Sequence, residues 1–88
     1  MTAHPNVTIY TTPYCPYCHA AKALLTKKGI RFHEIDVQDP ALRREMMARA
    51  AGRHTVPQIF IGETHVGGCD DIHALDAAGK LDPMLAPA

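Results

Sequence analysis

Hydrophobic residues recur along this 88-residue chain with two different spacings. A spacing of about two residues predicts short strands, and a spacing of about three to four residues predicts helices between them. Residues 6–10, NVTIY, are rich in β-branched side chains and lie between prolines, as expected of a strand. Residues 18–28 are rich in Ala and Leu, end in two lysines and precede Gly29, which predicts a helix and its C-terminal stop. Residues 30–37 have the composition of a second strand.

The second half of the chain predicts a helix, a hairpin and a short helix, over residues 41–51, 57–61 with 64–66, and 70–79. Asp39 and Pro40 form an N-cap and first-turn pair that opens the first of these helices, and Gly52 ends it. Gly62 and Glu63 join the two strands of the hairpin. The predicted order of elements is therefore βαβαββα.

This order predicts an α/β fold built on one four-stranded mixed sheet. A β-α-β unit favours a parallel pair with a right-handed crossover, and the hairpin extends the sheet with antiparallel strands. Helices are then expected on both faces of the sheet. A chain of 88 residues holds one modest core, so we expect a single domain over residues 1–88, with residues 1–5 and 86–88 as flexible tails.

Charge and composition narrow the choice of partners. Lys plus Arg and Asp plus Glu number nine each, so the net charge of zero gives no indication of a nucleic-acid partner or of an anionic membrane surface. The sequence contains no run of 18 apolar residues, and its first ten residues lack the pattern of a secretion signal. We therefore expect a cytoplasmic protein.

The segment TTPYCPYCHA, residues 11–20, contains the clearest candidate chemistry: a C-x-x-C pair followed by histidine. Proline is best tolerated at the first position of a helix, so Pro16 places Cys15 at the N-cap, facing the free N–H groups of the first turn. Those groups stabilise a thiolate, which makes Cys15 the predicted nucleophile. Cys18 lies one turn further into the helix and is the predicted resolving thiol.

Two metal chemistries compete with this redox interpretation. Cys69 and His73 could complete a zinc site with the pair, but a structural zinc usually replaces a core, and this chain has enough apolar positions to form one. C-x-x-C-H is also the attachment signature of c-type haem, which generally accompanies export. We assign no metal ligands.

Three segments, CPYC, TVPQIFI and GGCDD, resemble at these separations the dithiol glutaredoxins, most closely the small bacterial glutaredoxin 3 type. The resemblance extends from Val7 to Leu85. It implies a thioredoxin-like fold, a monomer, and glutathione as co-substrate with no permanently bound cofactor. It also implies that the protein reduces protein disulfides and protein–glutathione mixed disulfides through a redox-active Cys15–Cys18 disulfide, with ribonucleotide reductase as a candidate substrate.

The resemblance also implies a first set of glutathione contacts. Tyr17 would flank the bound glutathione. Thr55, Val56 and Pro57 correspond to a segment in which the backbone of Val56 pairs with the cysteinyl part of glutathione, as a small β-augmentation. That geometry implies a cis peptide bond before Pro57.

The GGCDD segment provides a second set. Its two glycines permit close approach of the backbone, and the free N–H groups of the next helix could hold a carboxylate. By resemblance this carboxylate is the γ-glutamyl end of glutathione, at Gly68 and Cys69, and Asp70 meets its ammonium group. Asp71 is interpreted as a first-turn helix acid.

The glycine carboxylate of glutathione requires a cation, and here the sequence departs from the family pattern. A lysine often lies three residues before the first cysteine, where this chain has Thr12. Arg44 is the best-matched replacement, and Arg53 is the second candidate. Weaker glutathione binding is one expected consequence.

Two other functions remain as alternatives at this point. One is a carrier of zinc or of a [2Fe–2S] cluster bound through Cys15. The other is an electron donor reduced by thioredoxin reductase, against which the GGCDD segment argues.

Overall fold

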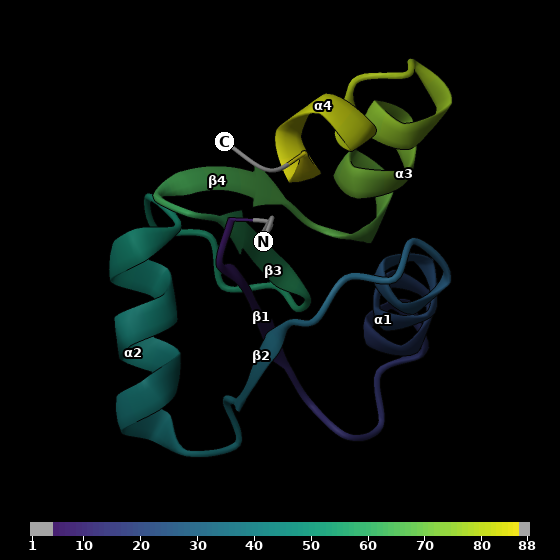
Figure 1. The fold of residues 1–88 in the computed structure, drawn as a ribbon. Helices are drawn as coiled ribbons and strands as arrows, with labels where there is room; N and C mark the ends of the chain where they lie inside the picture. The colour runs from purple at the N-terminus through teal and green to yellow at the C-terminus, as the bar shows by residue number, and fades with distance from the viewer. Residues whose placement is uncertain (1–4, 87–88) are drawn as a thin grey trace.

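The computed structural model describes residues 5–86, and within them the chain forms four strands and four helices. In chain order these are β1 (Val7–Thr11), α1 (Pro16–Lys27), β2 (His33–Asp36), α2 (Pro40–Arg49), β3 (Gln58–Ile61), β4 (Thr64–Gly67), α3 (Cys69–Ala77) and α4 (Leu81–Leu85) (Figure 1). Most of the expected tails, residues 1–4 and 87–88, lie outside the described residues. No helix within residues 5–86 has the length and apolar composition needed to cross a membrane.

The strands form one mixed sheet in the order β2-β1-β3-β4. β1 and β2 pair in parallel, whereas β3 is antiparallel to both β1 and β4. The prediction of a parallel β-α-β pair extended by an antiparallel hairpin is therefore confirmed.

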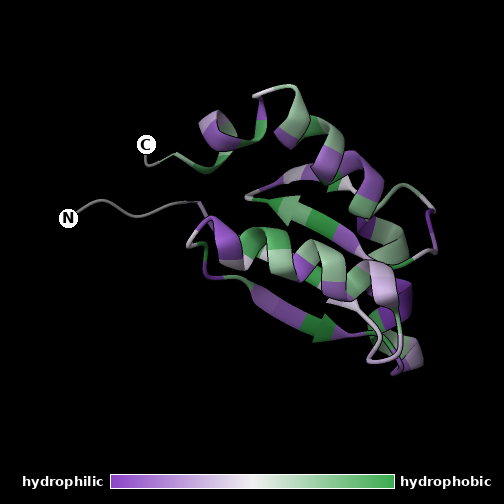
Figure 2. Ribbon diagram, turned by 90° about the vertical axis from the view of Figure 1, so that its right-hand side faces the viewer, coloured by the Kyte–Doolittle hydropathy of each residue, from purple (hydrophilic) through white to green (hydrophobic). Residues whose placement is uncertain are grey.

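Helices cover both faces of this sheet, as predicted (Figure 1). One core cluster joins α1, α3 and α4 to one face, and a second cluster joins α2 to the other. Alternation along β1 divides its side chains between them: Val7 and Ile9 enter the first cluster, and Tyr10 enters the second. Figure 2 shows hydrophobic residues along the strands between the helices.

β2 is shorter than the strand predicted over residues 30–37. It is an edge strand that pairs only with β1, in a register from Thr8 opposite His33 to Thr11 opposite Asp36. Ile30 and Phe32 pack against the first core cluster and lie outside the hydrogen-bonded ladder between β1 and β2. Their composition therefore resembles that of a strand without being part of one.

α4 is an element that the predicted order βαβαββα lacks. It is only five residues long, too short for a helical period to stand out, and it contains Pro83. Proline is tolerated there because it lies in the first turn. Leu81 and Leu85, four positions apart, are buried in the first core cluster.

The topology brings the three sequence segments together at one end of the strands of the sheet. β1 and β3 are antiparallel, so the C-terminal end of β1, followed by Cys15, adjoins the N-terminal end of β3, preceded by Pro57. β3 and β4 are also antiparallel, which brings the C-terminal end of β4 and then Gly68 to the same end. The fold thus brings CPYC, TVP and GGCDD together.

Candidate active site

Cys15 caps the N-terminus of α1. It has an extended backbone conformation, with φ −98° and ψ 112°, and Pro16 follows at the first helical position. The Sγ atom of Cys15 accepts the backbone N–H of Cys18 at 3.3 Å. N–H groups of a first helical turn have no partner within the helix, so this one is free to donate to the Cys15 sulfur. The N-cap position predicted from Pro16 is confirmed.

Cys18 differs sharply from Cys15 in exposure. Its side chain is 0% exposed, whereas Cys15 is partly exposed, and neither cysteine is in a disulfide. Burial raises the pKa of the Cys18 thiol to about 12, and the adjacent Cys15 adds to the increase, against opposing contributions from Thr12 and Lys22. Cys18 is therefore a neutral thiol in the reduced protein.

The segment that precedes β3 lies against the nucleophile. The peptide bond between Val56 and Pro57 is cis, as the resemblance implied. The Sγ atom of Cys15 lies 3.7 Å from the carbonyl oxygen of Val56, to which the S–H group donates when Cys15 is protonated. Backbone polar groups of this segment are thus within reach of anything attached to the Cys15 sulfur.

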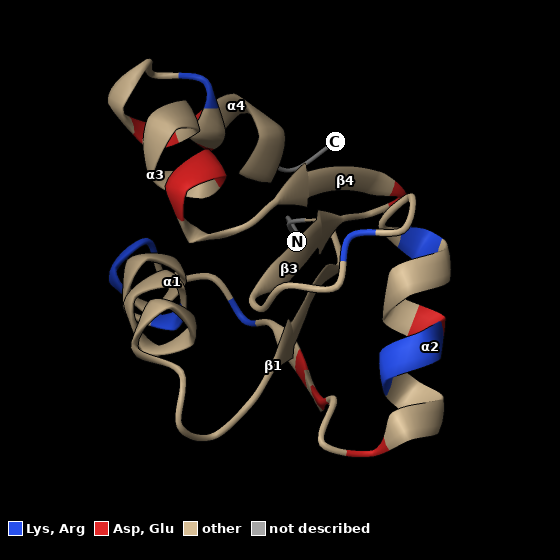
Figure 3. Cartoon of the chain, turned by 180° about the vertical axis from the view of Figure 1, so that it is seen from behind, with Lys and Arg blue, Asp and Glu red and all other residues tan. Residues whose placement is uncertain are grey.

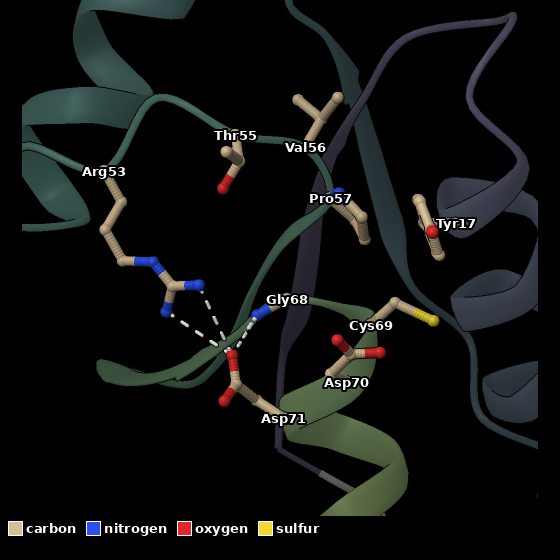
Figure 4. A pocket seen from close by; sticks show the side chains of 9 residues that line it. All are labelled: Tyr17, Arg53, Thr55, Val56, Pro57, Gly68, Cys69, Asp70 and Asp71. Carbon is tan, nitrogen blue, oxygen red and sulfur yellow. Dashed lines mark hydrogen bonds and ion pairs between the residues drawn. The ribbon is translucent and has the colours of Figure 1, made fainter.

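A cavity of about 460 Å³ opens beside these residues (Figure 4). The residues that line it come from α1, from the loop before β3 and from the start of α3: Tyr17, Arg53, Thr55, Val56, Pro57, Gly68, Cys69, Asp70 and Asp71. Seven of these nine are residues that the sequence nominated for glutathione; Arg53 was the second choice of cation, and Asp71 was interpreted as a helix acid. The nominated contacts therefore gather in one place, with one exception.

That exception is Arg44. It lies exposed on α2 and is not among the residues that line the cavity. Arg53 is the cation of the lining, because it belongs to the same loop as Thr55 and follows the end of α2. Arg53 is therefore the better placed of the two arginines, and the signal in the sequence that favours it is its separation of only two residues from Thr55, where the TVP segment begins.

Arg53 and Asp71 are joined across the cavity. Both terminal nitrogens of Arg53 lie 3.4 Å from Asp71 Oδ2, and the same oxygen accepts the backbone N–H of Gly68 at 2.8 Å (Figure 4). Asp71 thereby caps α3, whose first turn carries two acids (Figure 3). Asp70, the other of these two acids, lines the cavity.

Gly67 makes this arrangement possible. It has a φ of 115°, a conformation that side chains disfavour, and an added Cβ would collide with the Asp71 carboxylate. A glycine is therefore required where β4 turns into α3.

Cys69, at the start of α3, pairs with His73 one turn later. Its Sγ lies 3.4 Å from His73 Nδ1, and burial raises the pKa of the Cys69 thiol, with Asp70 and Cys15 contributing in the same direction. Within residues 5–86 no group of three or more His, Cys, Asp or Glu side chains is placed to hold a metal ion. The zinc set weighed from the sequence is therefore not assembled in this fold.

A family model for glutaredoxins matches residues 7–66, which include the cysteine pair, the loop before β3 and most of the sheet. The chain belongs to the glutaredoxin family. Its fold is thioredoxin-like, and its activity is that of a glutathione-dependent thiol–disulfide oxidoreductase.

Relatives and solved structures agree with this assignment. The glutaredoxin is 59% identical over 80 residues to glutaredoxin 3 of Escherichia coli K12, a match that covers 91% of this chain and 96% of the relative. The solution structure of a Brucella melitensis glutaredoxin is 58% identical, with a TM-score of 0.83, and covers 96% of this chain and 91% of that one. The crystal structure of a buckwheat glutaredoxin–glutathione complex is 33% identical, with a TM-score of 0.84 and coverage of 97% and 83%.

Proposed function

We propose that Cys15 is the nucleophile of this glutaredoxin and that Cys18 resolves its mixed disulfides. The observation that supports this division is the contrast between the two thiols. Cys15 is partly exposed and accepts an N–H of the first turn, whereas Cys18 is fully buried and holds its proton. An incoming disulfide therefore meets Cys15 first.

On a glutathionylated protein, the Cys15 thiolate attacks the glutathione sulfur. A bond forms between the Cys15 and glutathione sulfurs, the original disulfide breaks, and the protein leaves as a thiolate that takes up a proton. A second glutathione thiolate then attacks the glutathione sulfur on Cys15. This step yields oxidised glutathione and regenerates the Cys15 thiolate.

On a protein disulfide, attack by Cys15 leaves a mixed disulfide between Cys15 and the substrate. The negative charge at Cys15, which helps to raise the pKa of Cys18, is absent in this intermediate, so Cys18 deprotonates more readily. The Cys18 thiolate attacks the Cys15 sulfur and releases the reduced substrate. Two glutathione molecules then reduce the Cys15–Cys18 disulfide.

Glutathione docks in the cavity beside Cys15 in this proposal. The exposed backbone of Thr55 and Val56 pairs with its peptide groups, and Pro57 and Tyr17 flank the sulfur. The first turn of α3, from Cys69 onward, offers N–H groups to the γ-glutamyl carboxylate; Gly68, whose own N–H stays on Asp71, leaves room for it, and Asp70 faces the ammonium group. Arg53 binds the glycine carboxylate.

The protein substrates are disulfide-bonded or glutathionylated proteins, and we propose that the glutaredoxin acts on them as a cytoplasmic monomer with no resident cofactor. The three cysteines form no disulfide, which is consistent with work in a reducing compartment.

Serine variants of the two cysteines test the division of roles. Cys18→Ser should keep most of the activity on a peptide–glutathione mixed disulfide and lose most of the activity on a disulfide-bonded protein. Cys15→Ser should lose both activities. Turnover by Cys15→Ser with either substrate would contradict the proposal.

A further inference from the structure

The loop that forms one wall of the cavity has no strand neighbour to hold it. Residues 53–57 lie outside the helices and strands, and pairing with β1 begins only at Gln58, opposite Tyr10. Pro57 has no N–H with which to extend the ladder. The backbone of Thr55 and Val56 must therefore be held in place by side chains.

Gln58 provides such a hold from beneath the loop. Its side chain is 0% exposed, and its Nε2 atom donates to the carbonyl oxygen of Thr55 at 3.0 Å and to the hydroxyl oxygen of Thr55 at 3.1 Å. A carbonyl oxygen can only accept, so the amide nitrogen of Gln58 must face Thr55. The amide nitrogen of Gln58 is thus satisfied within the loop by Thr55.

His65, on the neighbouring strand β4, fixes the other end of the same amide. Its Nε2 atom lies 2.7 Å from Gln58 Oε1, and because that oxygen can only accept, His65 donates from Nε2. The imidazole ring stacks on Phe60 with centroids 4.8 Å apart, and Arg49 lies over the Phe60 ring at 4.2 Å. The ring is thus held in the orientation that donation requires.

We propose that Gln58, oriented by His65, is a positioning residue that holds the Thr55–Val56 backbone in the conformation to which the peptide part of a glutathione substrate binds. The inference rests on the glutathione site proposed above. Neither Gln58 nor His65 lines the cavity, so their effect passes through Thr55. A loop already ordered before binding does not lose conformational freedom when the substrate arrives, which increases affinity.

The variant Gln58→Met tests this role because it keeps the length of the side chain and removes both polar atoms. We expect KM for a glutathionylated peptide to rise about tenfold, as for the loss of one to two hydrogen bonds, with kcat changed by less than about twofold. The rate at which iodoacetamide alkylates Cys15 should change by less than about twofold, because the N–H of Cys18, which belongs to α1 and not to the loop, still contacts the sulfur.

Thr11→Val is the matched control. Thr11 is almost as buried as Gln58, and the substitution keeps its shape but removes the 2.7 Å hydrogen bond that its hydroxyl donates to Glu34 on β2, on the side of β1 away from β3 and the loop. We expect the KM of this variant to equal that of the wild type. An equal rise in KM for both variants would show a general loss of stability and would overturn the inference.

His65→Phe gives a second test that does not depend on Gln58→Met folding. It keeps a ring against Phe60 but removes the donor that orients Gln58, so we expect a smaller rise in KM, of about threefold. If the wild type turns over normally and KM is unchanged both in His65→Phe and in any Gln58→Met protein that folds, the positioning role of Gln58 is overturned, while the glutathione site stands. Wild-type protein without glutathione-dependent turnover would instead contradict the glutathione site itself.

Discussion

Arg53 and Asp71 form an ion pair of 3.4 Å that connects the loop before β3 to the first turn of α3. Each side chain is 47% exposed, so water competes with the pair and its contribution to stability is at most about 1 kcal/mol. Asp71 keeps the Gly68 N–H as a second partner if the arginine leaves. Arg53 can therefore turn to a ligand carboxylate with little loss.

We predict that Arg53→Met raises KM for glutathione and for glutathionylated peptides by about three- to tenfold, because one charge-assisted hydrogen bond is lost. The free energy of unfolding should change by less than about 1 kcal/mol. Steady-state kinetics and urea denaturation measure the two quantities.

Arg44→Met is the matched control for this prediction, since it removes the same charge from an exposed position outside the cavity. Its KM should remain within about twofold of the wild type. A larger rise in KM in Arg44→Met than in Arg53→Met would show that the glycine carboxylate of glutathione binds at α2 instead.

Alkylation should distinguish the two thiols of the pair. With a pKa of about 12, Cys18 is ionised to about one part in ten thousand at pH 8, and its side chain is also fully buried. We predict that iodoacetamide modifies Cys15 of the reduced protein and leaves Cys18 unmodified until the protein unfolds. Peptide mapping by mass spectrometry reads out both sites, and equal labelling of Cys18 in the folded protein would contradict its assigned state.

Glu34 should make stability depend on pH in the acid range. The Lys22 ammonium group, 2.9 Å away, and the Thr11 hydroxyl, 2.7 Å away, lower the pKa of Glu34 below its ordinary value. The folded state thus binds this proton less readily than the unfolded chain does. The stabilisation is complete above the ordinary glutamate pKa of 4.5 and is lost as pH falls through the lower folded-state pKa.

The variant Lys22→Met should therefore lose less stability than the wild type between pH 7 and pH 3, because Glu34 then titrates nearer its ordinary pKa. Urea denaturation at the two pH values measures the difference. Lys27→Met, an exposed substitution on the same helix, controls for the change in net charge and should behave as the wild type.

Ala51 offers a site for stabilisation. It follows the C-cap of α2 with a φ of 54°, in a turn that the Gly52 N–H closes on the Met47 carbonyl at 2.8 Å. This left-handed position favours glycine, so we predict that Ala51→Gly stabilises the protein by about 0.5–1 kcal/mol in thermal or urea unfolding. Ala48→Gly, within α2, should instead destabilise it by about 0.5–1 kcal/mol. Destabilisation by both substitutions would contradict the prediction.

Features set by local chemistry could be predicted from the sequence. Pro16 alone located the start of α1 and hence the position of Cys15, because a proline at the first helical position restricts the backbone around it. Asp39 and Pro40 located the start of α2 for the same reason. The resemblance to known motifs then predicted most of the residues that line the cavity.

Features set by distant packing could not be predicted in this way. Arg53 and Arg44 are both plausible cations in the sequence, and only the course of the chain after α2 decides which one reaches the cavity. The contact of His65 with Gln58 depends on the register of β3 and β4, which shifts between Ile59 and Phe60. No period along the chain reports such a shift.

The different depths of the two active-site sulfurs also bear on oxidative damage. Peroxides oxidise thiolates stepwise to sulfenic and then to irreversible sulfinic and sulfonic acids, and they attack exposed thiolates first. Cys18, buried and protonated, is shielded from this chemistry. Cys15 is the sulfur that peroxides reach. A sulfenic acid formed on Cys15 lies beside the Cys18 thiol, which can condense with it to a disulfide that glutathione reduces.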